Sequence, residues 1–395
     1  MKQSLVSAPG PSSPLARPLS PPGADVSRPA SRNIDARLFH AFCLFVLFIV
    51  ASSASFSAFY QKWHFREAGA RGYDPGVEFA NMIDGTARRP YIYRQLLPDI
   101  ANFMVRVLPL DTIARHIPAQ TKQKISVAFG LQSKSYPLQY LIVYILTYLS
   151  ALAATFALFG VCRAAAFSPP VAVFTSAIFM LLFPLFGVKG GYLFDYPELF
   201  FMAAAFWIAL KADWWWLLPI AALGTWNKES FLLFAIMLYP VLRRRYSRVT
   251  SIAAVAVLIA VCAAVYLPIR MHFAHNPGGA VEWHLKDHLN FYLHPFAMDT
   301  WIDRTYDLMF PALSSPLCTL LLAWTVWRTW HLLPLWVKRH AQLAALINIP
   351  LYLLFCLPGE FRDLSMLYIS FLLIVATILQ RWMQHVASAE LQSAT

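Results

Sequence analysis

The segment Gly72–Pro98 places acids and arginines close together, a combination that suits chemistry on a phosphate-linked group. Asp74 and Glu78 are four residues apart, so on a helix they share one face. A carboxylate at the edge of a membrane is partly removed from water and holds a proton more readily, which suits a general base. The structural alternative is that Asp74 only caps a helix that starts at Pro75.

Three arginines and two tyrosines follow in the same segment. Arg88, Arg89 and Arg94 each carry a guanidinium, which binds phosphate through two N–H groups at once. Tyr91 and Tyr93 are typical of the level of the lipid headgroups. The run predicts a donor-phosphate site that Tyr93 supports, and a general anchor to anionic lipids explains the same residues equally well.

Two further acids and an acid–base pair interrupt the apolar sequence that follows. Asp195 and Glu198 flank Pro197 at the start of an apolar segment, where acids either cap a helix or serve a site. Lys228 and Glu229 stand between two short apolar segments, where ionised groups are rare and are paired or functional. The two either satisfy each other at a tight turn, or Lys228 binds the donor phosphate and Glu229 supports it.

Two remaining clusters each have two explanations. Arg362 stands between Glu360 and Asp363, which suits a loop ion pair as well as it suits phosphate binding. His284 and His288 have the spacing of a zinc pair on one helical turn, and a surface amphipathic helix is the favoured reading. A divalent cation is therefore possible, and the sequence leaves its ligands unknown.

The composition shows where these residues must be positioned. The chain has 395 residues, of which 58% are hydrophobic and 13% are charged, and the apolar share exceeds the ~45–50% of soluble domains. Its partner is therefore the lipid bilayer. The net charge of +12 is better explained by membrane orientation and anionic lipids than by nucleic acid, which we do not expect it to bind.

Apolar segments predict an all-α, polytopic transmembrane bundle. A helix needs ~20 apolar residues to cross the hydrocarbon, and on that scale about ten spans are expected, of which the fourth, fifth and sixth are short. The predicted spans are 38–60, 138–161, 169–188, 197–210, 214–226, 230–242, 250–269, 309–328, 341–357 and 364–381.

Basic residues orient these spans. With the N-terminus in the cytoplasm, the short connections at Arg163, Lys211, Arg243–Arg248 and Lys338–Arg339 fall on the cytoplasmic side, as does the C-terminus. This predicts a disordered tail over 1–36, one membrane domain over 37–383 and a C-terminal tail over 384–395. The external loops are then 61–137 and 270–307, and helical spacing from Ile92 to Leu108 predicts an interfacial helix in the first.

The arrangement resembles the GT-C class of membrane glycosyltransferases, which includes protein O-mannosyltransferases and the lipid A aminoarabinose transferase. Tyr73-Asp74, then Glu78-Phe-Ala-Asn-Met-Ile-Asp-Gly85 and Pro90-Tyr-Ile-Tyr-Arg94-Gln-Leu-Leu-Pro98, is similar to the pattern of an acid, a helix and a Pro/Arg-containing run. Asp195 corresponds by position to an acid of the second external loop. The resemblance implies a polyprenyl-phosphate sugar donor, an external or periplasmic site in a bacterial inner membrane, and an inverting transfer.

Roles follow from this resemblance and from charge. Asp74, with Glu78 beside it, is expected to take the acceptor proton, and Arg94 with Lys228 or Arg362 to stabilise the leaving phosphate. Asp195 or Glu198 is expected to orient the acceptor or to hold a divalent ion.

Two alternatives come from other classes. A lipid-linked polysaccharide polymerase or ligase is expected to depend on Arg88, Arg89 and Arg94 more than on Asp74. A transporter or flippase is expected to place ionisable groups at the membrane midplane. The oligomeric state, the sugar and the acceptor are not encoded in any of these patterns.

Overall fold

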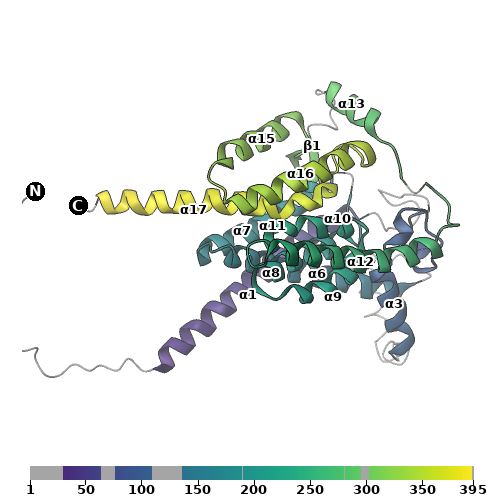
Figure 1. Ribbon diagram of the computed structural model, residues 1–395, viewed down its shortest axis with the longest axis horizontal. Coiled ribbons are helices and arrows are strands. Elements are labelled where there is room, and N and C mark those ends of the chain that lie inside the picture. The colour runs from purple at the N-terminus through teal and green to yellow at the C-terminus, as the bar shows by residue number, and fades with distance from the viewer. Residues whose placement is uncertain are drawn as a thin grey trace, which may run out of the picture. The chain divides into compact units, whose positions relative to one another are not determined.

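The computed structural model describes residues 30–63, 76–108, 136–188, 190–279, 281–294 and 302–393, most of which are helical (Figure 1). Contacts divide the chain into two units, Met1–Cys43 and Leu44–Thr395. The described part of the first unit is the beginning of helix α1 (Ala30–Gln61). Apart from the first residues of the span in α1, all features below lie in the second unit.

Five described helices are long and apolar enough to cross a membrane. They are Leu38–Gln61 within α1, α6 (Pro137–Ala164), α7 (Pro169–Leu182) with the 3₁₀ turn η2 (Phe183–Phe186), α12 (Arg248–His272), and Phe361–Glu390, formed by η4 (Phe361–Leu367) and α17 (Tyr368–Ser393). An all-α integral membrane protein is therefore confirmed at this level.

The other predicted spans also contain helices, but these are shorter or more polar. They are α8 (Asp195–Lys211), α9 (Leu217–Asn227) after the turn η3 (Trp214–Trp216), α10 (Ser230–Met237) with α11 (Tyr239–Leu242), α15 (Pro316–Trp330) and α16 (Leu335–Phe355). The number of crossings among them stays a prediction.

The predicted segment 309–328 begins differently in the structure. Strand β2 (Leu308–Pro311) pairs antiparallel with β1 (Ile302–Thr305), so the helix starts only at Pro316. Ser315 caps it by accepting a hydrogen bond from the Cys318 N–H at 3.4 Å, and proline suits the first helical position. The apolar run therefore includes a hairpin strand that hydropathy alone does not distinguish.

Helices α6 and α8 form the most extensive contact of the bundle. Both bury small residues, Ala151 and Ala154 on α6 and Ala203 and Ala205 on α8, which let helices in a membrane approach closely. A hydrogen bond between the Ser55 and Tyr196 hydroxyls, 2.7 Å apart, joins α1 to α8. This packing fixes the first turn of α8, where two of the predicted site acids lie.

The first loop contains helix α2 (Phe79–Ile83), the turn η1 (Tyr91–Tyr93) and helix α3 (Leu96–Val107). The predicted interfacial helix is thus present as α3 and begins four residues later than expected, after the turn. It buries Leu97 and exposes Phe103 and Val107. Its Asp99 accepts a hydrogen bond from the Trp226 indole N–H at 3.1 Å, which ties the first loop to the end of α9.

The connection that follows α12 packs on the first loop. Asn276 donates to the carbonyls of Gly85 and Ala87, both at 2.9 Å, and the Arg89 N–H donates to the Pro277 carbonyl at 2.8 Å. Helix α13 (Leu285–Leu293) comes next. These contacts hold Asn276 and Pro277 beside residues 85–89, which precede the turn before Arg94.

Candidate functional site

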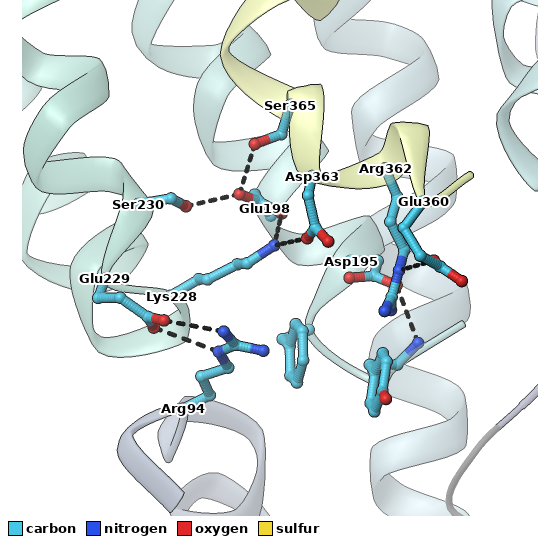
Figure 2. A network of polar contacts seen from close by, with 12 residues as sticks. Arg94, Asp195, Glu198, Lys228, Glu229, Ser230, Glu360, Arg362, Asp363 and Ser365 are labelled. Carbon is cyan, nitrogen blue, oxygen red and sulfur yellow. Dashed lines mark hydrogen bonds and ion pairs between the residues drawn. The ribbon is translucent and has the colours of Figure 1, made fainter. Parts of the chain in front are cut away.

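A polar network joins four parts of the chain that are far apart in sequence (Figure 2). Each contributing residue lies where a helix starts or breaks, since a backbone that leaves helical geometry turns its side chains toward other elements. Asp195 opens α8, and Lys228, with extended backbone, separates α9 from α10. Arg94 lies between η1 and α3, and Arg362 lies in η4.

Lys228 is the centre of the network. Its Nζ lies 2.8 Å from Glu198 Oε2 and 3.5 Å from Asp363 Oδ1. The other Glu198 oxygen, Oε1, accepts hydrogen bonds from the hydroxyls of Ser230 at 2.6 Å and Ser365 at 2.8 Å. Burial alone lowers the pKa of Lys228, but the attraction of the two carboxylates is larger and holds that pKa above its ordinary value.

Arg94 pairs with Glu229 through both ends of its guanidinium. Nε lies 3.2 Å from Oε2 and Nη2 lies 2.8 Å from Oε1, the bidentate geometry of a strong ion pair. Burial raises the pKa of Glu229, but the charge and hydrogen bonds of Arg94, together with the charge of Lys228, outweigh the effect of burial and lower that pKa below its ordinary value. Lys228 and Glu229 therefore bind different partners, so of the two sequence-based alternatives the one in which they satisfy each other at a tight turn is not what the structure contains.

Arg362 joins the start of α8 to the turn that precedes α17. Its Nε lies 2.5 Å from Glu360 Oε2 and its Nη1 lies 3.3 Å from Asp195 Oδ2. The guanidinium also lies 4.2 Å from the centroid of the Tyr192 ring. Asp195 accepts from the Tyr192 N–H at 2.8 Å, and its Oδ1 is buried without a hydrogen-bond partner among the described residues. Helix α8 begins at Asp195, and Phe194 occupies the N-cap position. Asp195 is therefore not the N-cap residue of this helix.

A cavity of about 330 Å³ opens against this network. All three network cations line it, together with Glu229 and Asp363. Tyr93, Leu233, Tyr266, Leu351 and Phe355 form its less polar wall, and Val281, Glu282 and His284 border it from the connection that precedes α13. Asp363 and Glu229 keep 23% and 28% of their side chains exposed, whereas Glu198 keeps 4%. The accessible carboxylates of the network are therefore those of Asp363 and Glu229, and Glu282 at the border of the cavity, outside the network, keeps 41% of its side chain exposed.

The predicted site residues divide into three groups. Five line the cavity: Tyr93, Arg94, Lys228, Glu229 and Arg362. Asp195 and Glu198 do not line it, and they hold Arg362 and Lys228 from behind. The remaining four are not brought to the cavity or lie outside the described residues.

Arg88, Arg89 and Glu78 belong to this last group. Arg88 lies 3.6 Å from Glu282, and Arg89 donates to the Gly278 carbonyl at 2.5 Å. Glu78 precedes α2, and none of the three lines the cavity. Asp74 lies outside the described residues, so its role as the base stays a prediction.

The sequence-based site omitted several residues that the structure brings in. In the sequence, Asp363 and Glu360 stand out only as neighbours of Arg362. Ser230 and Ser365 give no signal, because serine is common in membrane helices. Asn348 did carry one, since an amide inside a predicted apolar span needs a partner. It donates to the Asp363 carbonyl at 2.9 Å and accepts from the Met366 N–H at 3.2 Å.

The histidine pair does not join the network. His284 contacts Asp287 at 2.7 Å, whereas His288 is buried and its Nε2 contacts the Cys356 carbonyl at 3.0 Å. Among the residues that the structure describes, no group of three or more His, Cys, Asp or Glu side chains is arranged to hold a metal ion.

Comparison with protein-family models, with curated proteins and with solved structures finds no match for this chain. The functional argument therefore rests on the geometry of the network. That geometry provides three fixed cations, two accessible carboxylates and a partly apolar wall around one cavity.

Proposed function

We propose that this protein is an integral membrane glycosyltransferase that moves a sugar from a polyprenyl-phosphate donor to an acceptor at the external face. In this proposal about ten helices cross a bacterial inner membrane, with both termini in the cytoplasm. One observation carries it: Arg94, Lys228 and Arg362, which come from three separate connections, line the same cavity. Cations fixed in a partly dry cavity stabilise a leaving phosphate.

The donor phosphate would have to compete with carboxylates for these cations. The network contains three cations and five carboxylates, namely Asp195, Glu198, Glu229, Glu360 and Asp363. The weakest of the pairs that face the cavity is Lys228 with Asp363, at 3.5 Å. Arg94 also keeps Nη1 without a hydrogen-bond partner among the described residues. A phosphate between Arg94 and Lys228 therefore displaces only Asp363.

Displacement of Asp363 would leave a carboxylate without its cation at the edge of the cavity. Such a group accepts the proton of the acceptor hydroxyl while the acceptor oxygen bonds to the anomeric carbon. The bond from that carbon to the phosphate oxygen breaks, and the lipid phosphate leaves with the electron pair. Asp363 is thus a second candidate for the base beside Asp74, favoured by its position in the cavity.

The geometry favours this function over the polymerase or ligase alternative. That alternative relies on Arg88, Arg89 and Arg94 together, and of the three only Arg94 lines the cavity. Arg88 and Arg89 instead contact Glu282 and Gly278. The transporter alternative predicts ionisable groups at the membrane midplane. The cavity cations instead lie at helix ends and connections.

The test measures sugar transfer from a radiolabelled polyprenyl-phosphate sugar by the full chain in proteoliposomes. Arg94→Gln removes the guanidinium Nη1, the donor that Glu229 leaves available to the phosphate, and one charged hydrogen bond contributes about 1.5–3 kcal/mol, so we expect a loss of roughly 10- to 100-fold in kcat/KM. Arg106→Gln is the matched control, because Arg106 is exposed on the adjacent helix α3 and does not line the cavity. We expect its transfer rate to be unchanged.

The base is assigned by comparing Asp74→Asn with Asp363→Asn. The base variant loses transfer at every donor concentration, whereas a variant that only weakens a cation pair changes the donor KM. Full transfer by both Asn variants contradicts acid–base roles for both residues. Absence of transfer by the unmodified protein, with a glycan profile unchanged in cells that lack it, contradicts the glycosyltransferase proposal itself.

A further inference from the structure

A second hollow lies at the other end of the bundle. It has a volume of about 600 Å³ and is formed by the α6–α7 connection, the residues just before α16, and α17. Its polar lining consists of Arg163, Ser168, Thr377, Gln380, Arg381 and Gln384. No Asp or Glu lines it, in contrast to the acid-rich network at the first cavity.

The two arginines retain most of their hydrogen-bonding capacity. Arg163 donates to the Phe167 carbonyl at 2.5 Å through Nη1. Arg381 has no hydrogen bond or ion pair with any described residue. Gln380 accepts from the Ser168 N–H at 3.1 Å, which occupies its carbonyl oxygen and leaves its amide N–H groups available as donors. The lining is therefore rich in cationic and neutral donors.

The position along the bundle places this hollow near the opposite membrane surface. Thr147 of α6 donates to the Leu193 carbonyl at 3.4 Å, next to the first turn of α8, and Arg163 is near the C-terminal end of the same helix. The helical rise between these two residues amounts to about 24 Å. A distance of that size approaches the ~30 Å thickness of the hydrocarbon core, so the hollow and the polar network lie about one membrane thickness apart along α6.

We propose that this hollow is a binding site for a phosphate group, separate from the transfer site. Two guanidinium groups bind a phosphate in preference to a neutral ligand, because their positive charge and their forked N–H geometry both match the phosphate oxygens. The phosphate is carried by an anionic lipid headgroup or is free in solution, and both sources satisfy the same donors. The proposal does not depend on the reaction assigned to the first cavity.

The experiment uses the full chain in a zwitterionic detergent and two probes, dioctanoyl phosphatidylglycerol and inorganic phosphate. Native mass spectrometry gives the fraction of protein with one bound lipid, and excess inorganic phosphate is added as a competitor. We expect Arg163→Gln and Arg381→Gln each to weaken lipid binding by about tenfold or more, since each removes a charged hydrogen-bond donor. If inorganic phosphate displaces the lipid, the free anion is sufficient for binding. If phosphate does not displace the lipid, the site recognises the lipid headgroup.

Arg328→Gln is the matched control, because Arg328 is an exposed arginine of α15 that does not line the hollow. We expect it to bind both probes like the unmodified protein. Melting temperatures measured without probe verify that the variants fold. Arg381→Gln is expected to leave the melting temperature unchanged, because the Arg381 side chain has no partner among the described residues. Equal binding by all three variants, or no binding of either probe to the unmodified protein, overturns the proposal.

Discussion

Replacing Lys228 by methionine tests whether the network is held together by its central cation. Lys228 and Glu198 keep only 6% and 4% of their side chains exposed. At an effective dielectric constant of about 20, a contact of the length found for Glu198 is worth about 6 kcal/mol, and one of the length found for Asp363 about 5 kcal/mol. The net loss is smaller, because methionine needs no removal of a charge from water. Breaking a buried pair on one side destabilises by roughly 3–5 kcal/mol.

The substitution Glu198→Gln is expected to change the free energy of unfolding in opposite directions in the unmodified protein and in the Lys228→Met protein. In the unmodified protein, Glu198→Gln destabilises by about 1–3 kcal/mol, since Lys228 keeps Asp363 and the amide oxygen still accepts from the two serines. In the Lys228→Met protein, Glu198 is an unpaired buried carboxylate, so the same substitution removes the unfavourable charge. We therefore expect Glu198→Gln to restore roughly 1 kcal/mol or more of the free energy of unfolding.

The assay is equilibrium unfolding in mixed micelles by titration with dodecyl sulfate, followed by tryptophan fluorescence. Lys211→Met serves as the control, because Lys211 is an exposed lysine at the other end of α8, and we expect a change below about 0.5 kcal/mol. If Glu198→Gln lowers stability by the same amount in both backgrounds, the two side chains do not interact energetically and the reasoning fails.

Two further predictions concern the packing around the network. Burial lowers the pKa of His288, so the unfolded state binds the proton more readily. Stability is therefore retained above about pH 6.5 and decreases as the pH falls toward the folded-state value. The hydrogen-exchange protection factors of residues 285–293, which correct for the pH dependence of intrinsic exchange, are expected to be lower at pH 5 than at pH 7.5, and equal protection factors contradict this. Gly191→Ala places a Cβ 2.3 Å from the buried Phe59 ring, whereas Gly160→Ala meets Trp207, which is 43% exposed and can move, at 2.7 Å. Gly191→Ala is expected to lower the melting temperature more than Gly160→Ala. The reverse order would show that Phe59 moves more easily than Trp207, and it would refute this reasoning.

The helical fold follows from apolar segment lengths, and hydropathy locates a helix in every predicted span. It fails where two structures share the same composition. Leu308–Pro311 is as apolar as a helix start, yet it pairs with Ile302–Thr305 as a strand. The short segments around 197–242 are helices, but their length leaves the number of crossings open. Charge and length constrain where helices are, and tertiary contacts determine where each begins.

The sequence predicts which cations form the candidate site, but it does not predict which acid pairs with each cation. Ionised groups near membrane depth must find partners, so Arg94, Lys228 and Arg362 could be selected from sequence. Which acid meets which cation depends on how the helix ends converge, and no local pattern encodes this. Lys228 accordingly pairs with Glu198, thirty residues earlier, instead of with the adjacent Glu229.

The excess of acids over cations explains how one network can be both stable and responsive. A cluster with only cations around the cavity would repel itself in the absence of ligand. Here Glu198 and Asp195 are buried and fix Lys228 and Arg362 permanently, whereas Asp363 is partly exposed and shares Lys228 at the longer distance of 3.5 Å. The buried acids therefore set the positions of the cations. In the proposed function, a donor phosphate replaces Asp363 without disturbing the other pairs, so Asp363 is the acid whose protonation and pairing would change on binding.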